Sequence, residues 1–308
     1  MSTSGSKIGL YGALLANLAI AVIKFIAAAV TGSSAMISEG IHSIIDTGNA
    51  VLLLYGIQQS KKLPDRQHPF GHGKELYFWT LIVGVLIFAI GGGMSVYEGI
   101  THCMAPDELE DPFWDYIVLL CSFIFEGIST IIILRELKAH KGDKSFWKAI
   151  LQSKDPSVYA VMYENAADMI GILIAFLGVF LGHYLHNIYL DGIASILIGL
   201  MLGGVAVLLL RQSKSLLVGE AAELPLVESI SEIVTHDAAV ELIREPLTMH
   251  MSPDDVLLIL DIRFKKGMST EQVESAIDRM EEAIRHKHPV IKKIFMEANS
   301  IKESHVHE

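Results

Sequence analysis

Cysteine is scarce in this chain of 308 residues, which holds only Cys103 and Cys121. The two lie far apart and form no Cys-x-x-Cys pair, so neither a disulfide framework nor a thiolate zinc site is expected. Basic residues are also in the minority, with 24 Lys and Arg against 35 Asp and Glu and a net charge of −11. That balance argues against nucleic acid as the main partner, because phosphate contacts need cations.

The first seven residues lack the charged region and cleavage pattern of a secretory signal peptide, so the first apolar block is expected to be retained. Long Gly/Ser-rich linkers are absent as well. What the chain has in excess is apolar sequence, with 51% hydrophobic residues and a mean hydropathy of +0.44. These residues gather in blocks of about 20, long enough to cross a bilayer core of roughly 30 Å. The composition therefore predicts a membrane protein that is embedded in the lipid bilayer.

Six blocks of this kind follow one another, and each predicts a membrane-spanning helix. Glycines recur inside the blocks, which is common where membrane helices approach closely. The predicted spans are Ile8–Val30, Met36–Gln58, Tyr77–Ile100, Trp114–Leu134, Ser157–Leu181 and Tyr189–Leu210.

Positive charge is unevenly distributed among the connecting loops. The loops after the first, third and fifth spans contain no Lys or Arg, whereas the loops after the second and fourth spans are rich in both. Because basic loops stay in the cytosol, this pattern predicts that both termini are cytosolic. The basic residues are Lys61, Lys62, Arg66 and Lys74 in one loop and Arg135, Lys138, Lys141, Lys144, Lys148 and Lys154 in the other.

After Arg211 the composition becomes mixed, acidic and water-soluble. We therefore predict two domains, a transmembrane domain over residues 1–211 and a cytosolic domain over residues 212–308. Periodicity predicts helices over Glu223–His236 and Ser269–His286, and strands over Val256–Phe264 and Val290–Met296. Helices and strands in this order predict a small α+β domain.

Two pairs of ionisable residues lie inside predicted spans. His42 and Asp46 occupy the second span, and Glu164 and Asp168 the fifth. A charged residue at the centre of a membrane helix costs about 2.5–3.5 kcal/mol, so each needs a reason. The spacing of four places both members of a pair on one helix face. Two such helices facing each other would present one imidazole and three carboxylates, and four ligands are what tetrahedral zinc requires.

The same pairs have a simpler interpretation as polar contacts between helices. The metal interpretation adds a coupling mechanism. Without a cation, three carboxylates in a medium of low dielectric would repel one another, and at least one should take up a proton. Metal binding would then expel protons, and returning protons would expel the metal.

Two further intramembrane carboxylates are accessory candidates. Glu126, in the fourth span, either relays protons or forms a hydrogen bond with a neighbouring helix. Glu39 lies three residues before His42, close to the same helix face. It is either a group that supports the site or a residue near the outer end of its span.

The loop after the second span holds a second candidate metal site. Asp65, His68 and His72 combine one carboxylate with two imidazoles, a plausible zinc set. The alternative is a loop that shapes the entry to the third helix, since Pro69 and Gly71 favour a turn there.

At these residues the chain resembles the cation diffusion facilitator family over nearly its full length. The stretch Ser38–His42, running on to Asp46, is similar to the metal motif of the family's second helix, and His68–Lys74 is similar to its hallmark loop. The segment Ser153–Ser157, followed by Glu164, is most similar to the branch of zinc transporter nine.

The resemblance implies an all-α bundle of six transmembrane helices with a C-terminal cytosolic α+β domain of ferredoxin-like fold. It also implies a homodimer and proton-coupled metal export. By position, His42, Asp46 and Asp168 match transport-site ligands, and the Asp65 loop set matches a zinc site of some members. Glu164 stands where most members have histidine. The carboxylate makes the site richer in oxygen, so iron(II), manganese and cobalt remain possible cargoes beside zinc.

The sequence thus predicts a transporter, not an enzyme, that exports Zn²⁺ across the cytoplasmic membrane in exchange for protons. Fe²⁺, Mn²⁺ or Co²⁺ are alternative cargoes of the same mechanism. A membrane-embedded metalloenzyme would also use His and carboxylates, but no His-Glu-x-x-His motif or activated nucleophile is visible. A passive cation channel remains a third alternative.

Overall fold

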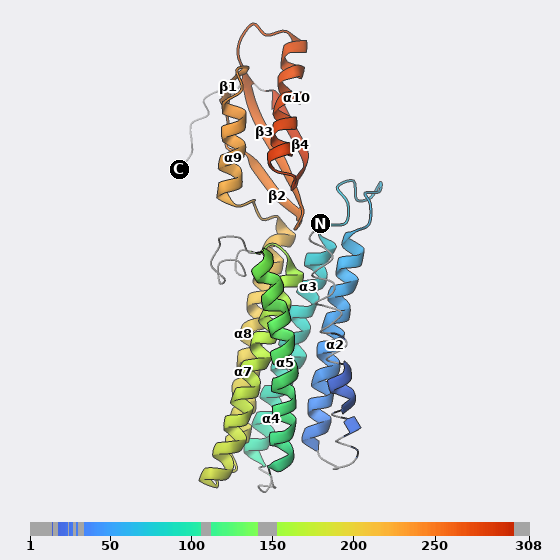
Figure 1. Cartoon of the computed structure of the whole chain (residues 1–308), viewed down its shortest axis with the longest axis vertical. Helices are drawn as coiled ribbons and strands as arrows, with labels where there is room; N and C mark the ends of the chain where they lie inside the picture. The colour runs from blue at the N-terminus through green and yellow to red at the C-terminus, as the bar shows by residue number, and fades with distance from the viewer. Residues whose placement is uncertain are drawn as a thin grey trace. The chain divides into compact units, whose positions relative to one another are not determined.

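The computed structural model describes residues 34–105, 112–140 and 153–298, with a few positions between 14 and 29 (Figure 1). The first predicted span, Ile8–Val30, lies mostly outside the described residues. The chain divides into two compact units. One contains the described residues up to Lys61 and Glu75–Lys214, and the other joins the loop Lys62–Lys74 to the residues from Ser215 on.

The first unit is a bundle of long helices. Among the described residues, four helical stretches are long and apolar enough to cross a membrane, namely Glu75–Met104, Asp115–Ile132, Val158–Leu185 and Leu190–Val218. They coincide with the third to sixth predicted spans. The elements are α2 (Ser34–Ser60), α3 (Glu75–Leu86), the π-helical η1 (Ile87–Gly92), α4 (Gly93–Met104), α5 (Phe113–His140), α7 (Pro156–Leu185) and α8 (Leu190–Val218).

Helix α2 coincides with the second predicted span and has 27 residues, about 40 Å of helix. It is not among the four apolar stretches, because it carries the polar residues Glu39, His42, Asp46 and Asn49. The predicted number of six helices therefore stays a prediction.

Helix α8 ends at Val218, beyond the predicted end at Leu210. Polar residues continue the helix because they have partners inside the bundle. Gln212 donates to the carbonyl oxygen of Ser153 at 3.2 Å, and the hydroxyls of Ser213 and Tyr159 lie 3.2 Å apart. The predicted boundary after residue 211 falls within this helix and remains a prediction.

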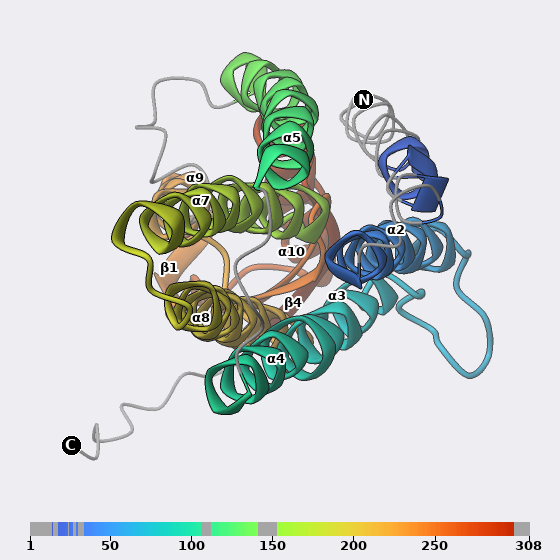
Figure 2. The same ribbon diagram turned by 90° about the horizontal axis from the view of Figure 1, so that it is seen from below.

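Helix α2 packs on α3, and α5 packs on α7 (Figure 2).

Glycines let helix α8 approach η1 and α4 backbone to backbone. A Cβ on Gly99 would lie 2.6 Å from the carbonyl oxygen of Gly192, and one on Gly199 would lie 2.7 Å from that of Gly92. Close packing at small residues is a main source of helix association in lipid. These contacts hold α8 against η1 and α4.

The second unit contains a small sheet and two helices. Its elements are α9 (Leu224–Thr235), β1 (Val240–Ile243), β2 (Leu247–Ser252), β3 (Asp255–Phe264), α10 (Thr270–Lys287) and β4 (Ile291–Ala298). Strand β3 is central. It pairs antiparallel with β1 near Phe264 and with β2 near Val256, and parallel with β4. Since β4 spans both regions, β1 and β2 lie end to end along the other edge of β3.

Alternation along β3 builds the core of this unit. Val256, Leu258, Leu260 and Ile262 are all fully buried, and residues of α9 and α10 pack against them. Ser269 caps α10 in a capping box with Gln272. The predicted helices and strands of this region match α9, β3, α10 and β4. The structure adds the short strands β1 and β2 before β3.

Candidate functional site

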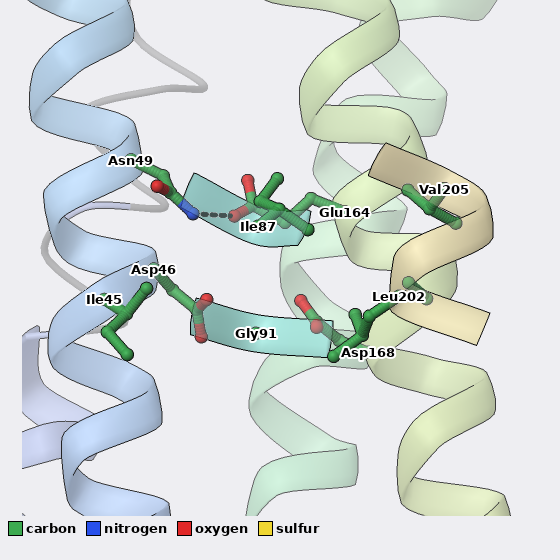
Figure 3. A pocket seen from close by; sticks show the side chains of 10 residues that line it. Ile45, Asp46, Asn49, Ile87, Gly91, Glu164, Asp168, Leu202 and Val205 are labelled. Carbon is green, nitrogen blue, oxygen red and sulfur yellow. Dashed lines mark hydrogen bonds between the residues drawn. The ribbon is translucent and has the colours of Figure 1, made fainter. Parts of the chain in front are cut away.

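A small cavity lies between α2 and α7 in the helical bundle (Figure 3). Asp46 comes from α2, and Glu164 and Asp168 come from α7, so the structure brings three of the predicted ligands together. The cavity has about 20 Å³ of free volume, enough for one water molecule or one ion. Its other lining residues are Ile45, Asn49, Ile87, Gly91, Ala167, Leu202 and Val205.

The spacing within each helix explains how the carboxylates meet. Glu164 and Asp168 are one helical turn apart, and both project towards α2 in Figure 3. The carboxylate of Asp46 faces that of Asp168 across the cavity. Apart from the polar Asn49, apolar residues form the rest of the wall, so the local dielectric is low and the repulsion between the three acids is strong. A divalent cation, with carboxylate oxygens around it, would relieve that repulsion.

Glu126 on α5 lies close enough to Glu164 to act on it electrostatically, as Asp46 does. Glu126 is half-buried and is not part of the cavity wall. Its role, as a proton relay or as a hydrogen-bonding contact with a neighbouring helix, stays a prediction.

The other two intramembrane candidates, His42 and Glu39, belong to α2, one turn and two turns before Asp46. Their side chains lie outside the described part of the chain. Their predicted roles therefore stay predictions.

Two features of the cavity were missed by the sequence reasoning. Asn49, three residues after Asp46, donates from Nδ2 to Oε1 of Glu164 at 3.1 Å and so joins α2 to α7. A polar side chain inside a span, on the face of Asp46, is a signal that points to it. The second feature is η1, the π-helical turn that carries Ile87 and Gly91 to the cavity. Such turns often occur at functional sites, but no sequence pattern predicted this one.

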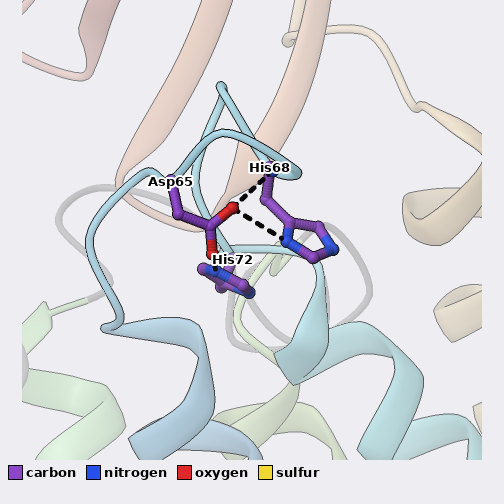
Figure 4. Close-up of side chains that lie close together, drawn as sticks. All are labelled: Asp65, His68 and His72. Atoms are coloured by element: carbon purple, nitrogen blue, oxygen red, sulfur yellow. Dashed lines mark hydrogen bonds and ion pairs between the residues drawn. The ribbon is translucent and has the colours of Figure 1, made fainter.

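The loop cluster is the second candidate site (Figure 4). One ligand atom each from Asp65, His68 and His72 lies within 4.8 Å of the others. The carboxylate of Asp65 lies 3.3 Å from Nδ1 of His68 and 3.1 Å from Nε2 of His72. Carboxylate oxygen and imidazole nitrogen are donors that zinc accepts, and water can complete a site that has three protein ligands. The residue types and their placement therefore fit a zinc ion.

Asp65 is held in the form a metal needs. Its Oδ1 accepts hydrogen bonds from the backbone N–H groups of His68 at 2.7 Å and Gln67 at 2.8 Å. The His68 N–H and the His72 ring lower the pKa of Asp65 from 3.8 to about 2. Because the pKa is lowered, the stabilisation of the loop by this carboxylate is present above pH 3.8 and is lost only as the pH falls through about 2.

The loop is anchored to the end of the sheet within the second unit. Lys293 of β4 donates from Nζ to the carbonyl oxygen of Phe70 at 2.9 Å and pairs with Asp255 at 3.2 Å. The ring of Phe70 contacts that of Phe295 edge-on, with centroids 6.3 Å apart. A Cβ on Gly73 would lie 2.4 Å from the carbonyl oxygen of Met251, so only glycine fits there. These contacts position the segment between His68 and His72.

The first prediction separates the two roles of Asp65. In Asp65→Asn the amide oxygen still accepts from the two backbone N–H groups, so the loop should keep its conformation while losing the anionic ligand. Zinc affinity of the loop should fall about tenfold or more. Isothermal titration in detergent, on an Asp46→Asn, Asp168→Asn background, measures this. Unchanged affinity would remove Asp65 from the ligand set, and Asp65→Ala shows the added cost of losing the turn.

The second prediction concerns the anchor of the loop. Lys293→Met should weaken zinc binding at the loop by up to about tenfold, because the loop then loses order that binding must restore. The neighbouring Lys292→Met, at an exposed position, is the control and should have no effect. The same titration measures both variants. Equal affinities for the two variants would show that the anchor does not position the ligands.

Comparison with known proteins adds an independent line. Residues 10–218 match the family described as the cation efflux transmembrane domain. The proton-coupled zinc antiporter SLC30A9, mitochondrial, of Xenopus laevis is 33% identical over 243 residues, 78% of this chain and 44% of that protein. Its Homo sapiens counterpart is 34% identical over 224 residues, covering 72% and 39%. The chain thus spans less than half the length of these relatives.

A bacterial relative covers more of its own length. The manganese efflux system protein MneP of Bacillus subtilis is 26% identical over 293 residues, 90% of this chain and 94% of that protein. The family match covers more than half of the chain, and the resemblance to the branch of zinc transporter nine is confirmed. The chain is therefore a multi-pass membrane protein of the cation diffusion facilitator, or cation efflux, family.

Proposed function

We propose that this protein is a divalent cation/proton antiporter that exports zinc, with iron(II), manganese and cobalt as alternative cargoes. The observation that carries the proposal is the meeting of Asp46, Glu164 and Asp168 at one small cavity between α2 and α7. Three adjacent carboxylates inside an apolar bundle cost free energy unless a cation or protons neutralise their charge.

The same acids supply the coupling. In a cavity of low dielectric, the three carboxylates are neutralised either by a metal ion or by protons. Each state excludes the other, because protons occupy the lone pairs that a metal needs. A helical bundle that opens alternately to the two sides of the membrane would then exchange one for the other. His42, one turn before Asp46 on α2, is proposed as the fourth ligand.

Two kinds of relative support different cargoes. The relatives in frog and human are named proton-coupled zinc antiporters, and the bacterial relative is named for manganese efflux. The oxygen-rich set at the cavity is compatible with both ions, since carboxylates suit manganese and Glu164 replaces an imidazole that would favour zinc.

The finer architecture is part of the proposal. We propose six transmembrane helices, with residues 1–211 as the membrane domain, and a ferredoxin-like cytosolic domain over residues 212–308. The basic loop Lys61–Lys74 supports cytosolic termini. The match to most of the length of a bacterial efflux protein supports a place in the cytoplasmic membrane. A homodimer is proposed on the family resemblance.

The third prediction tests the cavity. Asp46→Asn and Asp168→Asn keep the side-chain shape but remove a charged ligand, so each should lower zinc transport at least about a hundredfold. Zinc uptake into liposomes under an imposed pH gradient is the measurement. Glu98→Gln is the matched control, because Glu98 is an exposed carboxylate of α4 away from the cavity. Normal transport by both Asp variants would contradict the site. Flux that ignores the pH gradient would favour a channel, and turnover of an organic substrate without ion flux would favour an enzyme.

The fourth prediction concerns Glu164. Glu164→His introduces the imidazole that most of the family has, which suits zinc better than manganese. The zinc-to-manganese ratio of transport should therefore rise, by about tenfold if the side chain binds the ion directly. Competition between the two ions in liposomes measures the ratio. A ratio equal to that of the unmodified protein would take Glu164 off the ligand list.

A further inference from the structure

We propose that Asn49 is a further ion-binding residue of the cavity and favours manganese over zinc. The inference rests on the proposed function, since it concerns the same ion. Asn49 lines the cavity beside Asp46 and Glu164 and has 1% of its surface exposed. It differs from them in chemistry, because an amide oxygen is a neutral donor that adds no charge to the cavity.

Only one of the two polar atoms of the Asn49 side chain has a hydrogen-bond partner among the described residues. Its Nδ2 donates to Oε1 of Glu164 at 3.1 Å. Its Oδ1 is fully buried and has no hydrogen-bond partner among the residues that the structure describes. Buried carbonyl oxygens are nearly always paired, so an unpaired one at a cavity the size of an ion indicates a ligand.

Asn165 shows what a structural asparagine looks like in the same bundle. It is also buried, at 6% exposure, and follows Glu164 directly on α7. It points to α5, where Nδ2 donates to the hydroxyls of Ser129 at 3.2 Å and Thr130 at 3.5 Å. Asn165 does not line the cavity. The two asparagines therefore differ in surroundings rather than in type or burial.

The hydrogen bond to Glu164 places the amide within reach of any ion that Glu164 binds. Nδ2 engages Oε1 of Glu164, so Oε2 stays outside this hydrogen bond. Rotation of the amide by half a turn exchanges its nitrogen and oxygen, so Oδ1 can point to the same place. The side chain then acts as an orienting donor in one state and as a ligand in the other.

Coordination number explains the effect on selectivity. Zinc is satisfied by four ligands, and the three carboxylates with the proposed imidazole of His42 supply them without Asn49. Manganese prefers six oxygen-rich ligands, and carbonyl oxygen is among the donors that suit it. Removing Oδ1 should therefore weaken manganese binding much more than zinc binding.

The fifth prediction tests this in liposomes under a pH gradient. Asn49→Leu keeps the size of the side chain and removes both polar atoms, so the KM for manganese should rise about tenfold and that for zinc about twofold or less. Asn49→Gln retains a neutral amide oxygen and should raise the manganese KM less than Asn49→Leu does. Asn165→Leu is the matched control and should leave the ratio of the two KM values unchanged.

A second readout does not depend on transport. Isothermal titration of manganese and of zinc into detergent-solubilised protein with Asp65→Ala, His68→Ala and His72→Ala should show the same selective loss. If Asn49→Leu fails to fold in size-exclusion chromatography, Asn49→Ala replaces it with the same expected result. Equal losses for both ions, or no loss for either, would overturn the role of Asn49. If the unmodified protein carries neither ion, the proposed function itself fails.

Discussion

The helical bundle depends on how three partly buried carboxylates at one cavity are neutralised. Asp46, Glu164 and Asp168 surround a cavity that has room for one ion, and apolar side chains form much of its wall. In such surroundings the acids cannot all stay ionised without a cation. That constraint makes a cation or protons necessary partners of these acids in the folded helices.

Away from the three carboxylates, the helices pack closely against one another at glycines. Gly92, Gly99, Gly192 and Gly199 bring η1 and α4 against α8 at backbone distance. The π-helical turn η1 reaches the cavity through Gly91, a residue with no side chain to fill it. A π turn has one more residue than the α-helical turn and is often associated with function. Gly92, Gly99 and the irregular turn thus lie in one continuous stretch, Glu75–Met104.

The loop cluster of Asp65, His68 and His72 is ordered in a different way from the cavity, because Asp65 and His68 are exposed. Asp65 is half exposed, and its order comes from backbone N–H groups and two imidazoles rather than from burial. Lys293 and Phe295 of β4 hold Phe70, so the loop has a fixed place on the second unit. A metal in the loop would bind residues that the sheet already positions, which lowers the entropy that binding must overcome. In the bundle the charges favour a cation or protons, whereas in the loop the backbone already positions the candidate ligands.

The sequence by itself determined the hydropathy of four spans, the alternation in β3, the cap of α10 and the spacing of His42 with Asp46 and of Glu164 with Asp168. Each of these depends on neighbours within one helix or strand, where the period is fixed by backbone geometry. Only the tertiary structure decided that α2 faces α7, that Asn49 joins Glu164, and that the loop rests on β4. These contacts join residues 115 and 223 positions apart, and local periodicity does not fix which faces of two distant elements meet.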